Sequence, residues 1–394
     1  MDVREHRGMM IAATANIIRK GNAWYVPSQS GSRSYAVRIV GGDSTCTCPD
    51  YEQHGSACKH IHAVGFAVRR GEWKDGYPTG PRPGRVSYPQ LWPAYNTAQT
   101  TEKETFCHLL HDLVSPIPTP TQRTGRPRLP LSDMLFAAAF KVYSTMSGRR
   151  VATDLREAQA KGFIARAPHY NSVFEVIERA DVTPILHDLI VASSLPLSEV
   201  EHDFAVDSTG FGTSQFSRYY TMKYRGERVG RGWVKAHAMV GVKTNVVTSV
   251  RIGVHNSHDS PQFEPLFRET AKNFAIREVS ADKAYSGRLN VELAVSKGAA
   301  PYIPMKFNSR PDPRAPAWNR LFHLFAYRKD EFAAHYHKRS NVESTFSAIK
   351  RVFGDSVRSR LWEAQVNEVL LKILCHNVRC LIHAMHELGI GAAS

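Results

Sequence analysis

The chain has 394 residues, of which 42% are hydrophobic and 22% are charged. This composition excludes a disordered protein and is sufficient for two or three domains. The formal net charge of +15 predicts attraction to a polyanion, usually a nucleic acid, and the lack of an apolar run of about 18 residues argues against a membrane protein. Three of the six cysteines lie between Cys46 and Cys58, which favours a metal site in a reducing compartment over a disulfide scaffold.

The first predicted module, residues 1–70, begins with two short strands at residues 23–26 and 35–40. Three cysteines and a histidine follow in the spacing C-x-C, nine residues, C-x-H. These candidate zinc ligands are Cys46, Cys48, Cys58 and His60. Two close pairs of thiol or imidazole donors joined by a loop provide the tetrahedral set that structural zinc requires. We therefore predict a small strand–strand–helix module whose folding depends on Zn²⁺.

Two nearby histidines are alternatives for the fourth zinc ligand. His54 lies in the loop and His62 on the expected helix, and we rank both below His60. The segment from Trp24 to Val68 resembles the SWIM zinc finger, in which a strand pair precedes C-x-C, an aspartate and then C-x-H at the start of a helix. The resemblance implies a module that binds DNA or protein, and it does not distinguish these two roles.

Two proline-rich stretches predict a linker and bridging segment over residues 71–130. Within it, the basic segment at residues 123–128 contains a Gly-Arg-Pro core similar to that of an AT-hook, although a basic linker explains it as well and is favoured. Apolar residues then recur at helical spacing, so residues 131–198 are predicted to form a helical DNA-binding or accessory region.

The pattern changes in the last predicted domain, residues 199–394. Strands at residues 204–206, 233–242 and 246–254 lie close together in sequence and predict an antiparallel meander. Helices and strands then alternate, at residues 260–274, 277–281, 288–297 and 302–304, and helices follow from Asn341 onward. We predict an α/β fold in which helices flank a mixed sheet.

The segment from Tyr336 to Gly354 contains a candidate catalytic helix. At about 100° per residue, four of its side chains fall within a sector of about 60°. They are Tyr336, Arg339, Glu343 and Lys350. A carboxylate in this position can hold a metal ion at a phosphodiester while the cations hold flanking phosphates. The alternative is a solvated amphipathic helix with incidental ion pairs.

The spacing Y-x₂-R-x₃-E-x₆-K formed by these four residues resembles the signature of DDE transposases from bacterial insertion sequences. The resemblance spans about Gly125 to the C-terminus and implies a ribonuclease H-like core, in which two aspartates join the glutamate. Asp207 on the first strand and Asp282 at the end of the fourth match those aspartates. Asp203 and Asp259 are alternatives, and a helix N-cap is the simpler explanation of Asp259.

The resemblance implies a transposase that binds terminal inverted repeats in double-stranded DNA, cleaves a strand and joins it to target DNA. Mg²⁺ or Mn²⁺ would be held by Asp207, Asp282 and Glu343. The residues expected to contact DNA are Tyr336, Arg339, Lys350 and Arg351. A homodimer in the DNA complex, no membrane association, and a cytoplasmic, nucleoid-associated location in a prokaryote are further expectations.

Two other functions remain open at this point, a transposase-derived DNA-binding regulator without catalysis and a nuclease with the same core. The interval from Asp282 to Glu343 is too short for the large β insertion that some relatives carry there. Any DNA clamp that such an insertion provides would therefore be missing or would come from elsewhere in the chain.

Overall fold

The computed structural model describes residues 2–29, 33–71, 73–75, 91–122, 124–125, 127–213 and 232–391. The chain divides into two compact units. Residues 1–89 and 304–335 form the first, called here the finger unit, and residues 90–303 and 336–394 form the second, called here the core unit. Arg123 and Arg126 of the AT-hook-like segment, and residues 76–90 of the proline-rich linker, lie outside the described residues.

The finger unit contains a five-stranded sheet with the order β4-β3-β2-β1-β5. Its strands are β1 (Ile18–Lys20), β2 (Ala23–Pro27), β3 (Ser34–Val40), β4 (Asp43–Cys46) and β5 (Lys74–Asp75). Its N-terminal helices are α1 (Val3–Thr14), α2 (Pro49–His54) and α3 (Lys59–Arg70). The predicted strand pair and helix correspond to β2, β3 and α3. The prediction of a strand–strand–helix module was too small, because β1, β4 and β5 are too short to show an alternating pattern.

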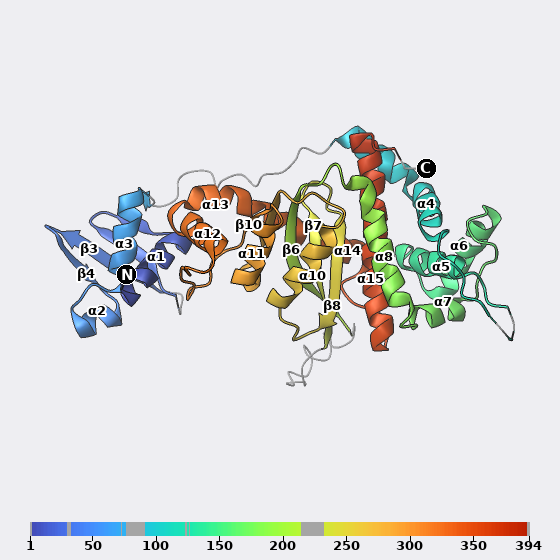
Figure 1. Ribbon diagram of the computed structural model, residues 1–394, viewed down its shortest axis with the longest axis horizontal. Helices are drawn as coiled ribbons and strands as arrows, with labels where there is room; N and C mark the ends of the chain where they lie inside the picture. The colour runs from blue at the N-terminus through green and yellow to red at the C-terminus, as the bar shows by residue number, and fades with distance from the viewer. Residues whose placement is uncertain are drawn as a thin grey trace. The chain divides into compact units, whose positions relative to one another are not determined.

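Residues 304–335 belong to the finger unit although they lie more than 200 positions from its first part. They form α12 (Pro316–Tyr327) and most of α13 (Lys329–Tyr336), and no strand occurs within residues 304–335, all of which are described. Helix α1 packs against both α3 and α12. The His6 ring stacks on Phe322 with centroids 6.0 Å apart. The helices inserted between Asp282 and Glu343 thus fold together with the N-terminal module (Figure 1).

A second sheet lies at the centre of the core unit, with the order β10-β9-β6-β7-β8. Its strands are β6 (Asp203–Gly212), β7 (Trp233–Gly241), β8 (Val247–Val254), β9 (Glu278–Ala281) and β10 (Ala300–Tyr302). Strands β6, β7 and β8 form the predicted antiparallel meander. Strand β9 pairs parallel with both β6 and β10. The register places Val206 opposite Ala281, so Asp207, within β6, and Asp282, directly after β9, lie at the same level.

Helices flank this mixed sheet, as the predicted ribonuclease H-like fold requires (Figure 1). Helix α10 (Ser260–Thr270) packs on β7 and β8, and α11 (Arg288–Ser296) packs on β10. Helix α14 (Ser340–Phe353) packs on β6 through a buried apolar stripe that contains Val342, Phe346 and Ile349. This packing holds the side chains of α14 beside β6.

The predicted helical region is confirmed by α5 (Leu131–Tyr143), α6 (Gly148–Ala160), α7 (Tyr170–Ile177) and α8 (Val182–Ser194). Helix α4 (Trp92–Val114) and the 27-residue α15 (Trp362–Leu388) complete it. Buried Asn377 on α15 joins this region to the sheet, because its side chain accepts from the Val247 amide at 2.9 Å and donates to the Ile190 carbonyl at 3.2 Å. Within the described ranges, none of the helices has the length and apolar character needed to cross a membrane.

Candidate metal cluster and catalytic cleft

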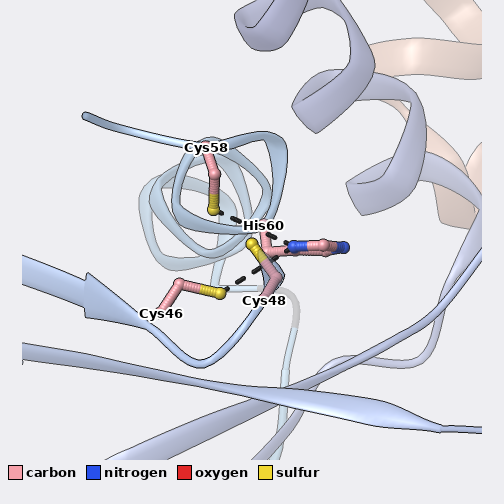
Figure 2. Close-up of side chains that lie close together, drawn as sticks. All are labelled: Cys46, Cys48, Cys58 and His60. Atoms are coloured by element: carbon pink, nitrogen blue, oxygen red, sulfur yellow. Dashed lines mark hydrogen bonds between the residues drawn. The ribbon is translucent and has the colours of Figure 1, made fainter. Parts of the chain in front are cut away.

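Four side chains converge in the finger unit, from the end of β4 and the start of α3 (Figure 2). The ligand atoms of Cys46, Cys48, Cys58 and His60 all lie within 4.8 Å of one another, and all four residues are buried. The Nδ1 atom of His60 is 3.8 Å from the Sγ atoms of both Cys46 and Cys58. Ligand atoms around tetrahedral zinc are about 3.5 to 3.8 Å apart, so the donor set and its spacing fit Zn²⁺.

The thiols of the cluster influence one another. The neighbouring Cys46 thiol, and then the His60 ring, lower the pKa of Cys58 to about 3, although burial opposes this change. The same interaction with Cys58 raises the pKa of Cys46. One thiol of the cluster is therefore poised to ionise, as metal coordination requires.

Neither alternative histidine joins the cluster. His54 is exposed, and its Nδ1 lies 3.0 Å from the Asp50 carbonyl oxygen. His62 lies where α1 approaches α3 so closely that a Cβ atom on Gly8 would collide with the His62 Cβ. Gly8 therefore allows the two helices to pack, and His62 contributes to that interface.

Carboxylates from separate elements meet beside the middle of β6 in the core unit. A single guanidinium joins two of them: Arg339 Nη1 lies 2.6 Å from Asp207 Oδ2, and Arg339 Nη2 lies 2.5 Å from Glu343 Oε1. Burial raises the pKa of Asp207, and the negative charges of Asp282 and Glu343 raise it further, although the Ser208 amide and Arg339 oppose this change. The three candidate carboxylates therefore interact electrostatically.

A cleft of about 680 Å³ opens beside these carboxylates. Its lining includes Asp207, Glu343, Lys350 and Arg351. The Lys350 ammonium lies 5.5 Å from the centroid of the buried Phe211 ring on β6, and burial lowers its pKa. The cleft thus combines acids that suit a metal ion with cations that suit phosphate groups.

Residues 200–378 match the family model described as the transposase DDE domain, and residues 35–64 match the SWIM zinc finger. The chain carries a transposase DDE domain and a SWIM zinc finger. The DDE match includes Asp207, Asp282 and Glu343, and the SWIM match includes the whole cysteine–histidine cluster.

A curated protein of Archaeoglobus fulgidus, named "Probable transposase for insertion sequence element ISA1214", is also similar to this chain. The two are 26% identical over 212 residues, which are 53% of this chain and 62% of that protein. The chain therefore spans less than two thirds of the length of this relative. The similarity to this distant relative supports the DDE assignment.

The prediction of one continuous helix from Tyr336 to Lys350 was wrong. In the DDE domain, α13 ends at Tyr336, a 3₁₀ turn occupies His337–Arg339, and α14 begins at Ser340. The rotation of about 100° per residue, which would align all four side chains, therefore applies only within α14. The side chains still meet, because the turn places the Arg339 guanidinium 5.8 Å from the Tyr336 ring centroid and beside Glu343.

The N-cap explanation of Asp259 was also wrong. Asp259 precedes α10 but makes no side-chain capping bond. Its Oδ1 instead accepts from Ser208 Oγ at 2.8 Å and lies 2.9 Å from Lys235 Nζ. It also lies 3.3 Å from Nδ1 of buried His237, whose other neighbour is the Tyr285 hydroxyl at 3.3 Å. This Asp259 network connects Ser208, next to Asp207, with Tyr285, three residues after Asp282.

The other alternative, Asp203, is paired at the start of β6. Its carboxylate lies 2.7 Å from Lys338 Nζ and 2.9 Å from Arg277 Nη2. Burial alone would raise the pKa of Asp203, but these two cations hold it below its ordinary value. Sequence reasoning did not identify these partners or the Asp259 network, because the groups involved come from separate strands and turns.

Proposed function

We propose that this protein is the transposase of an insertion element, which binds the terminal inverted repeats, cleaves a strand at the ends of the element and joins the freed 3′ hydroxyl to target DNA. The observation that carries the proposal is the arrangement at the cleft, where Asp207 and Glu343 share the Arg339 guanidinium and form one acidic site. The DDE match and the name of the Archaeoglobus relative support the same activity.

The donor set at the cleft suits Mg²⁺ or Mn²⁺, because hard divalent ions prefer carboxylate oxygens. Asp207, Asp282 and Glu343 would hold the metal. When bound, divalent ions activate the attacking oxygen and stabilise the leaving oxygen of a phosphodiester. The chain's own cations would stabilise the negative charge of the DNA. Lys350 and Arg351 line the cleft and would neutralise phosphates on either side of the scissile bond.

Arg339 has a separate part in this proposal. It balances the charge of Asp207 and Glu343 and orients both carboxylates before metal binding. Tyr336 lies against the same guanidinium and would contact the DNA end together with it. Transposition requires two element ends to be brought together, so we also propose that the protein acts as a homodimer on DNA.

The test is cleavage and joining of labelled duplexes that carry the ends of the element encoding this chain. Asp207→Asn, Asp282→Asn and Glu343→Gln should each reduce cleavage by at least about 1,000-fold, since an amide lacks the negative charge that the metal requires. DNA binding should remain, because removing a carboxylate near phosphate does not remove a cation. The matched control is Glu264→Gln, which changes an exposed glutamate on α10 that pairs with Arg268.

The outcomes separate the three possible functions. Binding without cleavage by the wild-type protein would indicate a DNA-binding regulator. Cleavage without joining would indicate a nuclease. Wild-type cleavage by Glu343→Gln would remove the basis of the proposal, because α14 would then contribute only an ordinary solvated face.

A further inference from the structure

A loop carries the chain from the cleft toward the helical region of the core unit. Gly354 and Asp355 line the cleft. The loop then runs beside the end of β6, where the Gly212 amide donates to the Asp355 carbonyl at 3.0 Å and the Val357 amide donates to the Gly212 carbonyl at 2.9 Å. Arg358 follows three residues after Asp355, which is at most about 10 Å of extended chain.

Two buried residues of α15 hold this loop in place. Glu368 accepts from the Arg358 amide at 3.0 Å and from the Ser359 hydroxyl at 2.8 Å. Lys372 donates to the carbonyls of Gly354 at 3.2 Å and Ser356 at 2.6 Å. The Glu368 carboxylate and the Lys372 ammonium thus both form hydrogen bonds with the loop, and these bonds fix the position of Arg358.

Arg358 meets the helical region at the turn between α5 and α6. Its guanidinium donates to the Met146 carbonyl at 3.5 Å. The exposed Arg149 and Arg150 begin the next helical turn, and Arg149 lies 5.8 Å from the Tyr170 ring centroid. Met146 and Phe174 are exposed at 45% and 37%. They lie in the same area, because Phe174 is so close to Gly148 that a side chain added there would contact its ring. Exposed cations interleaved with apolar and aromatic groups are typical of nucleic-acid surfaces.

A buried lysine, Lys141, adds to the positive charge of this area. Lys141 is only 8% exposed, and its ammonium forms no hydrogen bond or ion pair with any residue in the described part of the chain. It lies 5.7 Å from the Phe174 ring centroid. Burial lowers its pKa, the charge of Arg358 lowers it further, and Glu368 alone opposes these effects. The Glu368 carboxylate, which already bonds to the loop, therefore acts on both Lys141 and Lys372, and Asp355 is the other acid that acts on Lys372.

We propose that Arg149, Arg150 and Arg358 form a binding site for the phosphate backbone of the element-end DNA, next to the catalytic cleft. This inference rests on the proposed transposase function and extends it to a second group of residues. The loop places Arg358 directly after the cleft-lining residues, so a duplex with its scissile phosphate at Asp207 and Glu343 continues past Lys350 and Arg351 onto this surface. Phosphate contacts of this kind fix the register of the duplex without reading its sequence.

The test measures the salt dependence of DNA binding without a divalent metal, so that cleavage does not enter the result. The triple variant Arg149→Ala/Arg150→Ala/Arg358→Ala should bind an end duplex at least about ten-fold more weakly, because it loses three cations that would neutralise phosphates. The slope of log K against log salt should become shallower by about 0.9 for each phosphate that the variant no longer neutralises. The weakening should be equal for the end duplex and for a scrambled duplex of the same length.

Arg268→Ala is the matched control, because it removes one exposed arginine of the core unit from α10, where the side chain pairs with Glu264. It should leave the affinity and the slope unchanged. Glu343→Gln should retain the wild-type slope while losing cleavage. If the triple variant kept the slope of Arg268→Ala, the proposed phosphate site would be overturned. This outcome would also be expected if the surface bound an acidic protein in place of DNA. If the slope fell as expected but the wild-type protein never cut DNA, the transposase proposal would fail and the phosphate site would stand.

Discussion

Arg339 and Asp207 form a close ion pair, with Nη1 of the guanidinium 2.6 Å from Oδ2 of the carboxylate. The other terminal nitrogen of Arg339 reaches Glu343. The arginine therefore occupies oxygen atoms that we assign to a metal ion. Cation binding at this site involves competition between the guanidinium and the metal for the same carboxylates.

This competition predicts the effect of Arg339→Ala on metal affinity. Removal of the guanidinium leaves Asp207 and Glu343 with uncompensated charge, so the variant should bind Mg²⁺ or Mn²⁺ more tightly than the wild type, on the order of ten-fold. Calorimetric titration without DNA measures this change. Arg351→Ala is the control, since its guanidinium lies 3.5 Å from the Ser347 hydroxyl and pairs with neither carboxylate. Equal or weaker metal affinity in Arg339→Ala would show that the guanidinium does not compete.

The Asp259 network predicts a positioning role for a residue that we do not assign to the metal. Asp259→Ala removes the acceptor of Ser208 and leaves Lys235 without its carboxylate partner. We expect the Mg²⁺ concentration for half-maximal cleavage to rise by at least about ten-fold, because Asp207 loses the support of its neighbour. Asp259→Asn keeps an oxygen acceptor for Ser208 and should recover part of the loss. Asp154→Ala, at a surface pair with Lys103, should have no effect, and an unchanged magnesium dependence in Asp259→Ala would contradict the role.

Zinc should stabilise helices far from the cluster in sequence. Cys58→Ser should lose about one zinc ion per chain in elemental analysis. It should also increase hydrogen exchange in α12, because α1 packs on both α3 and α12. Cys107→Ser changes a buried free cysteine of the core unit and should retain the zinc. Slow exchange in α12 after zinc loss would indicate that the finger and the inserted helices fold independently.

Buried His376 predicts a loss of stability in acid. Burial lowers its pKa to about 4, although its hydrogen bond to the Asn245 carbonyl at 2.9 Å opposes this change. Between the ordinary value of about 6.5 and the folded value, the unfolded chain binds the proton and the folded chain does not. The free energy of unfolding should therefore fall as the pH decreases through this window, by about 2 to 3 kcal/mol at pH 4.5.

Chemical denaturation at pH 7 and pH 4.5 measures this contribution of His376. The decrease should be smaller by that amount in His376→Gln, which retains an N–H donor for Asn245. His202→Gln, which changes a partly exposed histidine of the same unit, should behave as the wild type does. Equal acid sensitivity in wild type and His376→Gln would show that this histidine is already charged in the folded state.

The sequence was most informative where the relevant residues are close together. The spacing around Cys46 and Cys58 identified the cluster, because two close pairs of donors need only a short loop between them. The buried strand that contains Asp207 and the Y-x₂-R-x₃-E-x₆-K spacing pointed to Asp207 and Glu343, which share Arg339 in the structure. Such local patterns carry both chemistry and geometry.

Other features depend on interactions between distant parts of the chain. The partners of Asp259 come from β6 and β7, so its sequence position before a helix indicated only a cap. The 3₁₀ turn at His337–Arg339 interrupts a segment whose composition differs little from that of a helix. Neither the loop fixed by Glu368 nor the packing of α12 on α1 has a sequence signature, since the residues involved meet only in the folded chain.

The two-part construction of the finger unit also affects synthesis on the ribosome. The first part, which includes the apolar Met9, Met10 and Ile11 of α1, emerges well before residues 304–335. At about 5 to 20 residues per second, the delay is on the order of ten to fifty seconds. The nascent finger can acquire zinc during this time, but the surface of α1 that later receives Phe322 stays without its partner. Chaperone binding to this surface during translation would therefore protect the growing chain until the inserted helices leave the exit tunnel.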